Sequence, residues 1–215
     1  MPSASLIGPD GTVVWQGHPG SLSDDEIETQ LEEVEKANRV STWAFLISSQ
    51  IGALPDALKG VKKLLEKMKF GAALKKVEAT LGKLEGDDAE AGERVRAWIA
   101  QSGEGGIEAA SGLVRDGQIY KAYLKYEEIE DRFKGHDLSK QAKAAGGALK
   151  KGKETKLEIK ASKKLEDIKT EMRGERKAED QLALLKPMLS KKYADTLAGK
   201  QAAEMAAELE KKVEK

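Results

Sequence analysis

The sequence predicts a mainly α-helical protein that opens with a β-hairpin and a helix and continues as an α-helical repeat-like domain. Two short runs of apolar and β-branched residues flank a Gly-Pro-Asp-Gly turn at residues 8–11, which is typical of a hairpin. From residue 56 onward, apolar residues recur at intervals of three and four, the period of an amphipathic helix. Charged residues make up 34% of the chain, as long solvated helices require.

The hairpin is predicted from two runs, residues 5–7 and residues 12–15, which are apolar or β-branched. Pro9 presets the backbone angle of the first central turn position. Gly11 tolerates the positive φ that a closing bulge needs. These local signals agree with one another, so they predict two antiparallel strands.

A helix start follows the hairpin, because Ser23 and Glu26 have the spacing of a capping box. The apolar stripe of this helix is formed by Ile27, Leu31 and Val34. We assign residues 1–39 to this strand, strand and helix unit, which is too small to bury a core alone. Residues 40–55 carry no charge and are too short to span a bilayer, so we predict a connecting segment buried between this unit and the rest. The alternative is an exposed interaction patch.

The N-terminal residues also carry a family resemblance. Residues 1–20 read MPSASLIGPDGTVVWQGHPG, and with the helix start after them they resemble the final ββα segment of thioredoxin-like domains. The resemblance is strongest to the TlpA-type thiol–disulfide oxidoreductases of the bacterial cell envelope. It implies that Pro2 occupies the cis-proline position, which lies beside the redox cysteines of that family and helps to dock the substrate. It also implies a location in the bacterial cell envelope or periplasm.

The resemblance covers about the first sixth of the chain and lacks the catalytic part of the family. The W-C-x-x-C motif of these enzymes lies upstream, this chain has no cysteine, and Gly8 replaces the usual Asp of the turn. We therefore expect the parent protein to begin before Met1 and to carry that motif. In such a parent, a thiolate attacks a substrate disulfide and forms a mixed disulfide. The expected function is that of the C-terminal fragment of a thiol–disulfide oxidoreductase, redox-inert and not catalytic as given.

Residues 56–215 are predicted as one helical domain. Glycine-rich residues 101–106 are expected to break the chain, and Pro187 to end or kink a helix. Helices are expected at residues 55–68, 71–84, around 95–99, and at 107–116, 118–133, 138–174, 177–189 and 197–213.

An internal comparison suggests a repeat within this domain. Residues 67–81 and residues 115–129 contain the two similar segments, and a weaker third copy starts near Gly174. The aligned pairs are Phe70 with Ile119, Ala73 with Ala122, Leu74 with Tyr123 and Val77 with Tyr126. The pattern resembles the helical hairpins of tetratricopeptide-like repeats. The alternative function is therefore a non-enzymatic helical scaffold that binds another protein in a groove between helix pairs.

Composition and motifs exclude several functions. Lys and Arg together number 37, as do Asp and Glu, so no net charge draws the chain to nucleic acid. The absence of cysteine excludes disulfides, thiolate catalysis and Cys-based zinc sites within these residues. No phosphate-binding loop, nucleotide fingerprint or nucleophile elbow is present, and no apolar run is long enough to cross a membrane. The sequence indicates no cofactor.

The histidines and lysines suggest structural roles. His18 and His136 both lie in predicted loops beside glycine, without companion ligands, so no metal site is predicted. Residues 140–164 contain nine lysines against Glu154 and Glu158, with no aromatic residue for base stacking. We interpret this stretch as a solvated helix face, and the alternative is an anion-binding patch.

Overall fold

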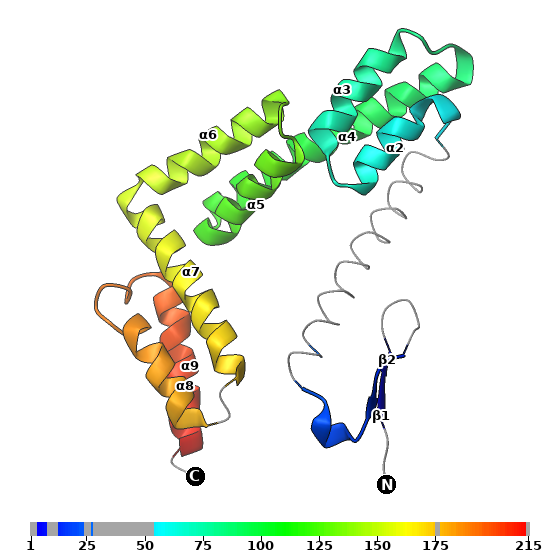
Figure 1. Cartoon of the computed structure of the whole chain (residues 1–215). Coiled ribbons are helices and arrows are strands. Elements are labelled where there is room, and N and C mark those ends of the chain that lie inside the picture. Colours follow the sequence, from blue (N-terminus) through cyan, green and yellow to red (C-terminus); the bar gives the residue numbers. More distant parts are fainter. Residues whose placement is uncertain (1–3, 8–12, 24–26, 28–53, 175–176, 214–215) are drawn as a thin grey trace. The chain divides into compact units, whose positions relative to one another are not determined.

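The computed structural model is mainly helical, with a two-stranded antiparallel sheet at the N-terminal end of the chain (Figure 1). This confirms the predicted fold class at the level of helices and hairpin. Among the described residues there are eight α-helices. The chain forms two compact units, residues 1–68 with 73–98 and residues 69–72 with 99–215. The structure describes residues 4–7, 13–23, 27, 54–174 and 177–213.

The predicted hairpin is confirmed. Strands β1 (Ala4–Ile7) and β2 (Val13–Gly17) pair antiparallel, with Leu6 opposite Trp15 and an irregularity of register after Leu6. A 3-10 turn, η1 (Pro19–Ser21), follows the second strand.

Several N-terminal predictions lie outside the described residues. They concern the hairpin turn at residues 8–12, the connecting segment up to residue 53, and most of the N-terminal helix. Of that helix only Ile27 is described, and its backbone N–H donates to the Ser23 carbonyl at 3.3 Å.

The remainder of the first unit is helical. A 3-10 turn, η2 (Asp56–Leu58), leads into α2 (Lys59–Glu66), α3 (Phe70–Leu81) and the first part of α4 (Gly86–Arg115). Three of the four apolar positions of the helix predicted over residues 55–68, Leu58, Val61 and Leu65, have no exposed surface, and the fourth, Met68, is half-buried. The three buried side chains supply the core of this unit together with Val77 and Val95, which are equally buried.

The second unit contains the longer run of helices. Gly152 has an extended backbone and separates α6 (Asp137–Lys151) from α7 (Lys153–Gly174), so the predicted single helix over residues 138–174 is wrong and two helices form instead. The Thr155 hydroxyl donates to the Leu149 carbonyl across this break and stabilises it. In order, the helices are α5 (Ile119–Arg132), α6 (Asp137–Lys151), α7 (Lys153–Gly174), α8 (Ala178–Leu185), η3 (Lys186–Met188) and α9 (Leu197–Val213).

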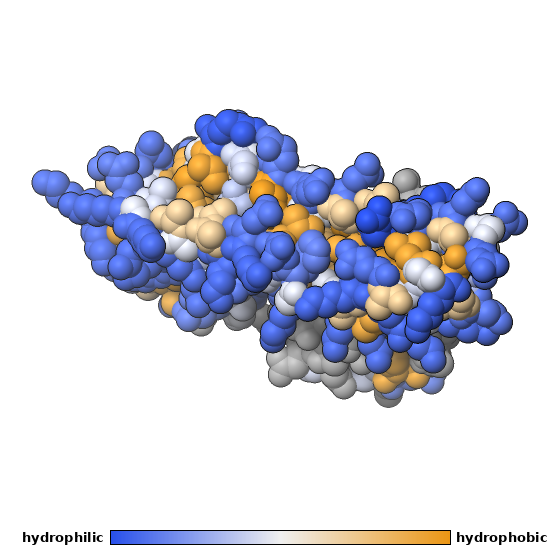
Figure 2. Space-filling view, turned by 90° about the horizontal axis from the view of Figure 1, so that it is seen from above, coloured by the Kyte–Doolittle hydropathy of each residue, from blue (hydrophilic) through white to orange (hydrophobic). Residues whose placement is uncertain are grey.

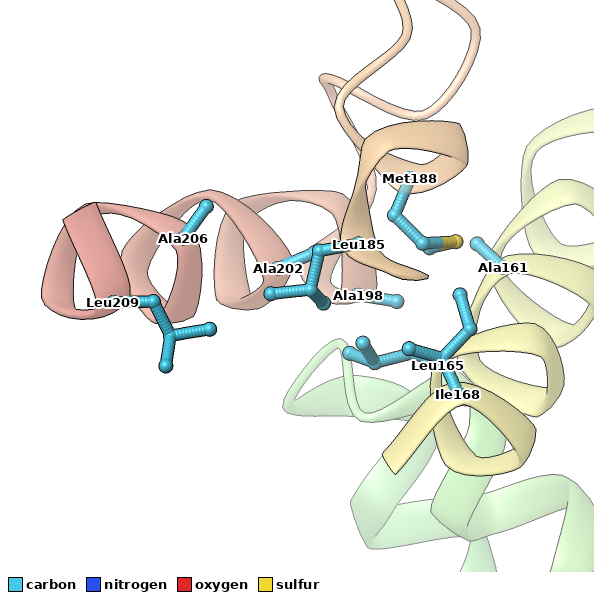
Figure 3. Packing of buried hydrophobic residues seen from close by; sticks show 9 residues of the cluster. All are labelled: Ala161, Leu165, Ile168, Leu185, Met188, Ala198, Ala202, Ala206 and Leu209. Carbon is cyan, nitrogen blue, oxygen red and sulfur yellow. The ribbon is translucent and has the colours of Figure 1, made fainter. Parts of the chain in front are cut away.

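Helices α7, α8 and α9 share one apolar cluster (Figure 3). Met188 points toward Ala161 in that view, and Leu185 lies among side chains of the other two helices. Helix α8 ends before Pro187, as predicted, because proline has no backbone N–H to donate. The chain continues after α8 only as the 3-10 turn η3. The buried members are Ala161, Leu165, Ile168, Leu185, Met188, Ala198, Ala202, Ala206 and Leu209.

The predicted break at residues 101–106 is wrong, because α4 runs through these glycines without interruption. A Cβ on Gly103 would lie 2.6 Å from Leu138 Cδ1 and 2.7 Å from Phe133 Cζ. A Cβ on Gly106 would lie 3.1 Å from Ile129 Cδ1. Gly103 and Gly106 therefore allow α4 to lie close to the neighbouring helices, and they do not end α4.

We expect Gly103→Ala to lower the free energy of unfolding by about 1–3 kcal/mol, because the added methyl group overpacks against two enclosed side chains. Gly105 is the matched control, since it is exposed on the same helix and a Cβ there meets nothing within 4 Å. Gly105→Ala should raise the same free energy by about 0.5–1 kcal/mol. Guanidinium unfolding measures both, and equal effects would contradict the packing account.

Candidate functional site

A buried carboxylate joins α7 to the start of α9. Glu158 is only 9% exposed, and its Oε2 accepts the backbone N–H of Leu197 at 2.8 Å while its Oε1 accepts that of Ala198 at 3.3 Å. The Ser162 hydroxyl donates to the same carboxylate at 3.0 Å. The first N–H groups of a helix have no partner within the helix and carry partial positive charge. The carboxylate therefore satisfies these donors and fixes the position of α9 on α7.

The loop before α9 completes this helix start. Thr196 is 6% exposed, and its hydroxyl accepts the N–H of Gly199 at 2.9 Å while donating to the Tyr193 carbonyl at 2.7 Å. A Cβ on Gly199 would lie 1.8 Å from the Tyr193 carbonyl oxygen, so only glycine fits against this loop. The start of α9 is thus held both by its own cap residue and by Glu158, which lies 39 residues before Leu197.

This helix start forms one wall of a groove of about 670 Å³ between α5, α7 and α9. Leu124 on α5 and Leu197 on α9 are 45% and 53% exposed, so two large apolar side chains face solvent at the groove. Figure 2 shows that hydrophilic residues cover most of the surface seen from above, with hydrophobic residues between them. The residues lining the groove are Gln118, Ile119, Tyr120, Lys121, Leu124, Glu158, Ser162, Leu165, Glu166, Leu197, Ala198 and Gln201.

Three charged side chains line the groove, and the two acidic ones are engaged, whereas Lys121 forms no ion pair among the described residues. Glu158 is engaged by the backbone of α9, and Glu166 pairs with Lys169 at 3.5 Å. Burial, followed by the charges of Glu166 and Asp167, raises the pKa of the Tyr120 hydroxyl. The phenol is therefore a neutral hydrogen-bond donor at physiological pH, beside apolar and amide side chains.

Contacts between α5 and α6 fix the other groove wall. The Tyr123 hydroxyl donates to Glu127, and Lys150 Nζ lies 4.5 Å from the Tyr123 ring centroid and 3.6 Å from Glu127. Burial, followed by the hydrogen bond to Glu127, raises the pKa of Tyr123. On the side toward α4, the hydroxyls of Tyr126 and Ser111 are hydrogen-bonded at 3.0 Å. These polar contacts hold α5 in place, so Leu124 is presented from a fixed helix.

The residues named from sequence do not converge on this groove. The Nδ1 of His18 accepts the N–H of Gly20 at 3.2 Å, and the Nδ1 of His136 accepts the N–H of Leu138 at 3.3 Å as the cap of α6. Both histidines therefore stabilise local turns. Pro2 lies outside the described residues.

The described part of the chain contains neither a metal-binding cluster of acidic and histidine side chains nor a helix that could cross a membrane. Its His, Asp and Glu side chains form no group of three or more that could hold a metal ion. None of its helices combines the length and apolar character needed to cross a membrane.

Sequence reasoning missed the role of Glu158, which was counted with the surface charges of a lysine-rich stretch. The sequence does contain an indication of this role, because Glu158 begins a helical stripe that continues with Ala161, Leu165 and Ile168 at spacings of three, four and three. A carboxylate on an otherwise buried stripe needs a specific partner. The sequence does not say that the partner is a helix start 39 residues away.

No protein family, curated protein or solved structure matches this chain in the comparisons.

We expect Glu158→Gln to lower the free energy of unfolding by about 1–3 kcal/mol, because the amide nitrogen would face a backbone donor and leave it unpaired. Glu171→Gln is the control, since Glu171 is exposed on the same helix and its substitution should change stability by less than about 0.5 kcal/mol. Chemical denaturation followed by circular dichroism measures both values. Similar small losses in the two variants would show that the Glu158 contacts contribute little.

Proposed function

We propose that this protein is a non-enzymatic helical scaffold whose groove between α5, α7 and α9 binds an amphipathic helical segment of another protein. The proposal rests on two half-exposed leucines, Leu124 on α5 and Leu197 on α9, which line a groove of about 670 Å³. Apolar side chains held at fixed positions around a concavity are the usual anchors for an amphipathic helix.

The geometry favours a protein segment over a small molecule. Small-molecule sites enclose about 70–90% of their ligand, whereas this groove leaves both leucines about half exposed. The two acidic side chains of its lining are already engaged, so an occupant needs apolar side chains and has no need of basic residues to match those acids. Gln118 and Gln201 line the same groove, and their amides can donate to and accept from a polar edge of the bound segment.

We also propose that the helical region is repeat-like, and equivalent turns support this. Met68 and Gly117 both have positive φ, 58° and 73°, and lie 49 residues apart. Gly86 and Gly135 have φ of 53° and 84° at the same separation. Three of the four pairs aligned from sequence are buried in both copies: Ala73 with Ala122, Leu74 with Tyr123 and Val77 with Tyr126. In the fourth pair Phe70 is buried and Ile119 is half-buried. Repeated helix pairs of this kind commonly present binding grooves.

The test uses a 15-residue alanine-based peptide with leucines at helical positions i, i+3, i+4 and i+7, and a shuffled peptide of the same composition. We expect the amphipathic peptide to shift the backbone amide resonances of residues 119–124 and 197–201 in the full chain. Leu124→Ser with Leu197→Ser should weaken binding about 30-fold, because roughly 2 kcal/mol of apolar burial is lost.

Leu189→Ser is the control variant, since Leu189 is 43% exposed and does not line the groove. Its affinity for the amphipathic peptide should equal that of the unchanged chain. Equal binding of the shuffled peptide, or shifts confined to amides away from the groove, would count against the proposal.

A second candidate function rests on the hairpin. We propose, from the resemblance of residues 1–20, that the N-terminal residues are the end of a thioredoxin-like oxidoreductase domain, and the antiparallel pairing of β1 and β2 is compatible with this. The intact mass of the protein from its native source tests this, against the 23.3 kDa of the present chain. A heavier protein with a C-x-x-C motif ahead of Pro2 is the expected result, and a native chain beginning at Met1 would contradict the proposal.

A further inference from the structure

Helix α7 carries a row of exposed lysines, which we call the basic face: Lys153, Lys156, Lys160 and Lys163. Their spacings of three, four and three place them on one side of the helix over about 15 Å. Glu158 and Ser162, which line the groove, are each two residues from Lys160, and two residues correspond to about 200° around the helix. The basic face is therefore a separate surface from the proposed groove.

Four of the other five lysines of residues 140–164 are engaged, and the fifth, Lys151, is exposed in the last turn of α6 with no ion pair among the described residues. Lys164 Nζ lies 5.7 Å from the ring centroid of Tyr193. Three further lysines form ion pairs, Lys140 with Asp137 at 2.8 Å, Lys143 with Glu130 at 3.1 Å and Lys150 with Glu127 at 3.6 Å. Within the residues that the structure describes, no member of the basic face forms an ion pair. The lysine-rich stretch thus has a mostly paired set of lysines on α6, whereas the basic face on α7 has no ion pair.

The basic face is electrostatically unfavourable in the chain alone. Lys153 and Lys156 lie in the first turn or next to it, where the helix dipole disfavours positive charge. Successive members are three or four residues apart, the spacing at which like charges on a helix repel. Glu166 and Asp167 follow Lys163 by about one turn, but Glu166 pairs with Lys169 and Asp167 forms no ion pair with Lys163. Glu158 is turned toward α9. A local arrangement that opposes stability is typical of a functional surface.

We propose that the basic face of α7 binds an acidic helical segment of a partner protein. Glutamates at spacings of three and four on such a segment would match the four lysines and relieve their repulsion. A membrane surface fits less well, because the apolar side of α7, with Ala161 and Leu165, is buried in the cluster with α8 and α9. Nucleic acid fits less well because residues 140–164 contain no aromatic side chain.

The experiment compares two variants of the full chain that remove equal charge. Lys156→Gln with Lys160→Gln alters the basic face, and Lys140→Gln with Lys143→Gln alters lysines that are already paired. The probe is a 14-residue alanine-based peptide with glutamates at spacings of three and four, and its counterpart carries glutamine in their place. We expect the glutamate peptide to bind the unchanged chain more tightly than the glutamine peptide. The first variant should weaken that binding about tenfold and the second should leave it unchanged.

The two variants also differ in their expected stability. Neutralising the basic face should raise the midpoint of thermal unfolding by about 1–3 °C, whereas neutralising the paired lysines should not raise it. Equal affinities for the glutamate and glutamine peptides, or equal weakening by the two variants, would overturn the proposal. So would tighter binding of phosphatidylserine vesicles or of a single-stranded RNA oligonucleotide through the same two lysines, since the face would then serve another class of partner.

Discussion

The carboxylate of Glu158, bonded to the first backbone N–H groups of α9, is the interaction on which the arrangement of α7 and α9 depends. A helix end buried without partners is unfavourable, and a short side chain near it in sequence can satisfy only part of the need. Here Thr196 supplies the local cap and Glu158 the distant one. With the start of α9 fixed in this way, its small residues Ala198 and Ala202 lie against α7 in the apolar cluster. The same constraint places Leu197 at the edge of the groove.

Close approach between helices is a second constraint on the unit formed by residues 69–72 and 99–215. Gly103 and Gly106 let α4 pack directly on the side chains of α5 and α6, while Gly199 lets α9 begin against the Tyr193 carbonyl. Phe133 lies at the centre of this packing, with its ring edge-on to Phe70 at 5.6 Å between centroids. Small residues at such points leave large ones fully enclosed. The walls of the groove are therefore set by packing of side chains that have little freedom to move.

Local chemistry predicted most of the element boundaries. The hairpin follows from alternating apolar runs around a turn, and α8 ends where Pro187 requires it. The predictions that failed depend on distant contacts: Gly103 resembles a helix break in sequence, but its packing partners lie 30 and 35 residues further on. Conversely, the apolar period over residues 138–174 predicts one continuous helix, but Gly152 interrupts it. Glu158 could have been suspected from its place on a buried stripe, yet its partner α9 is distant in sequence, so the groove could not be predicted.

The proposed scaffold needs a rigid start of α9, and amide hydrogen exchange of Leu197 and Ala198 tests that requirement most directly. First-turn amides of an ordinary helix have no acceptor within the helix and exchange quickly. If Glu158 holds these two N–H groups, they should exchange as slowly as amides in the middle of α9. Exchange at the rate of an unstructured peptide would contradict the account, because neither the fixed helix start nor the groove wall that it supports would then exist.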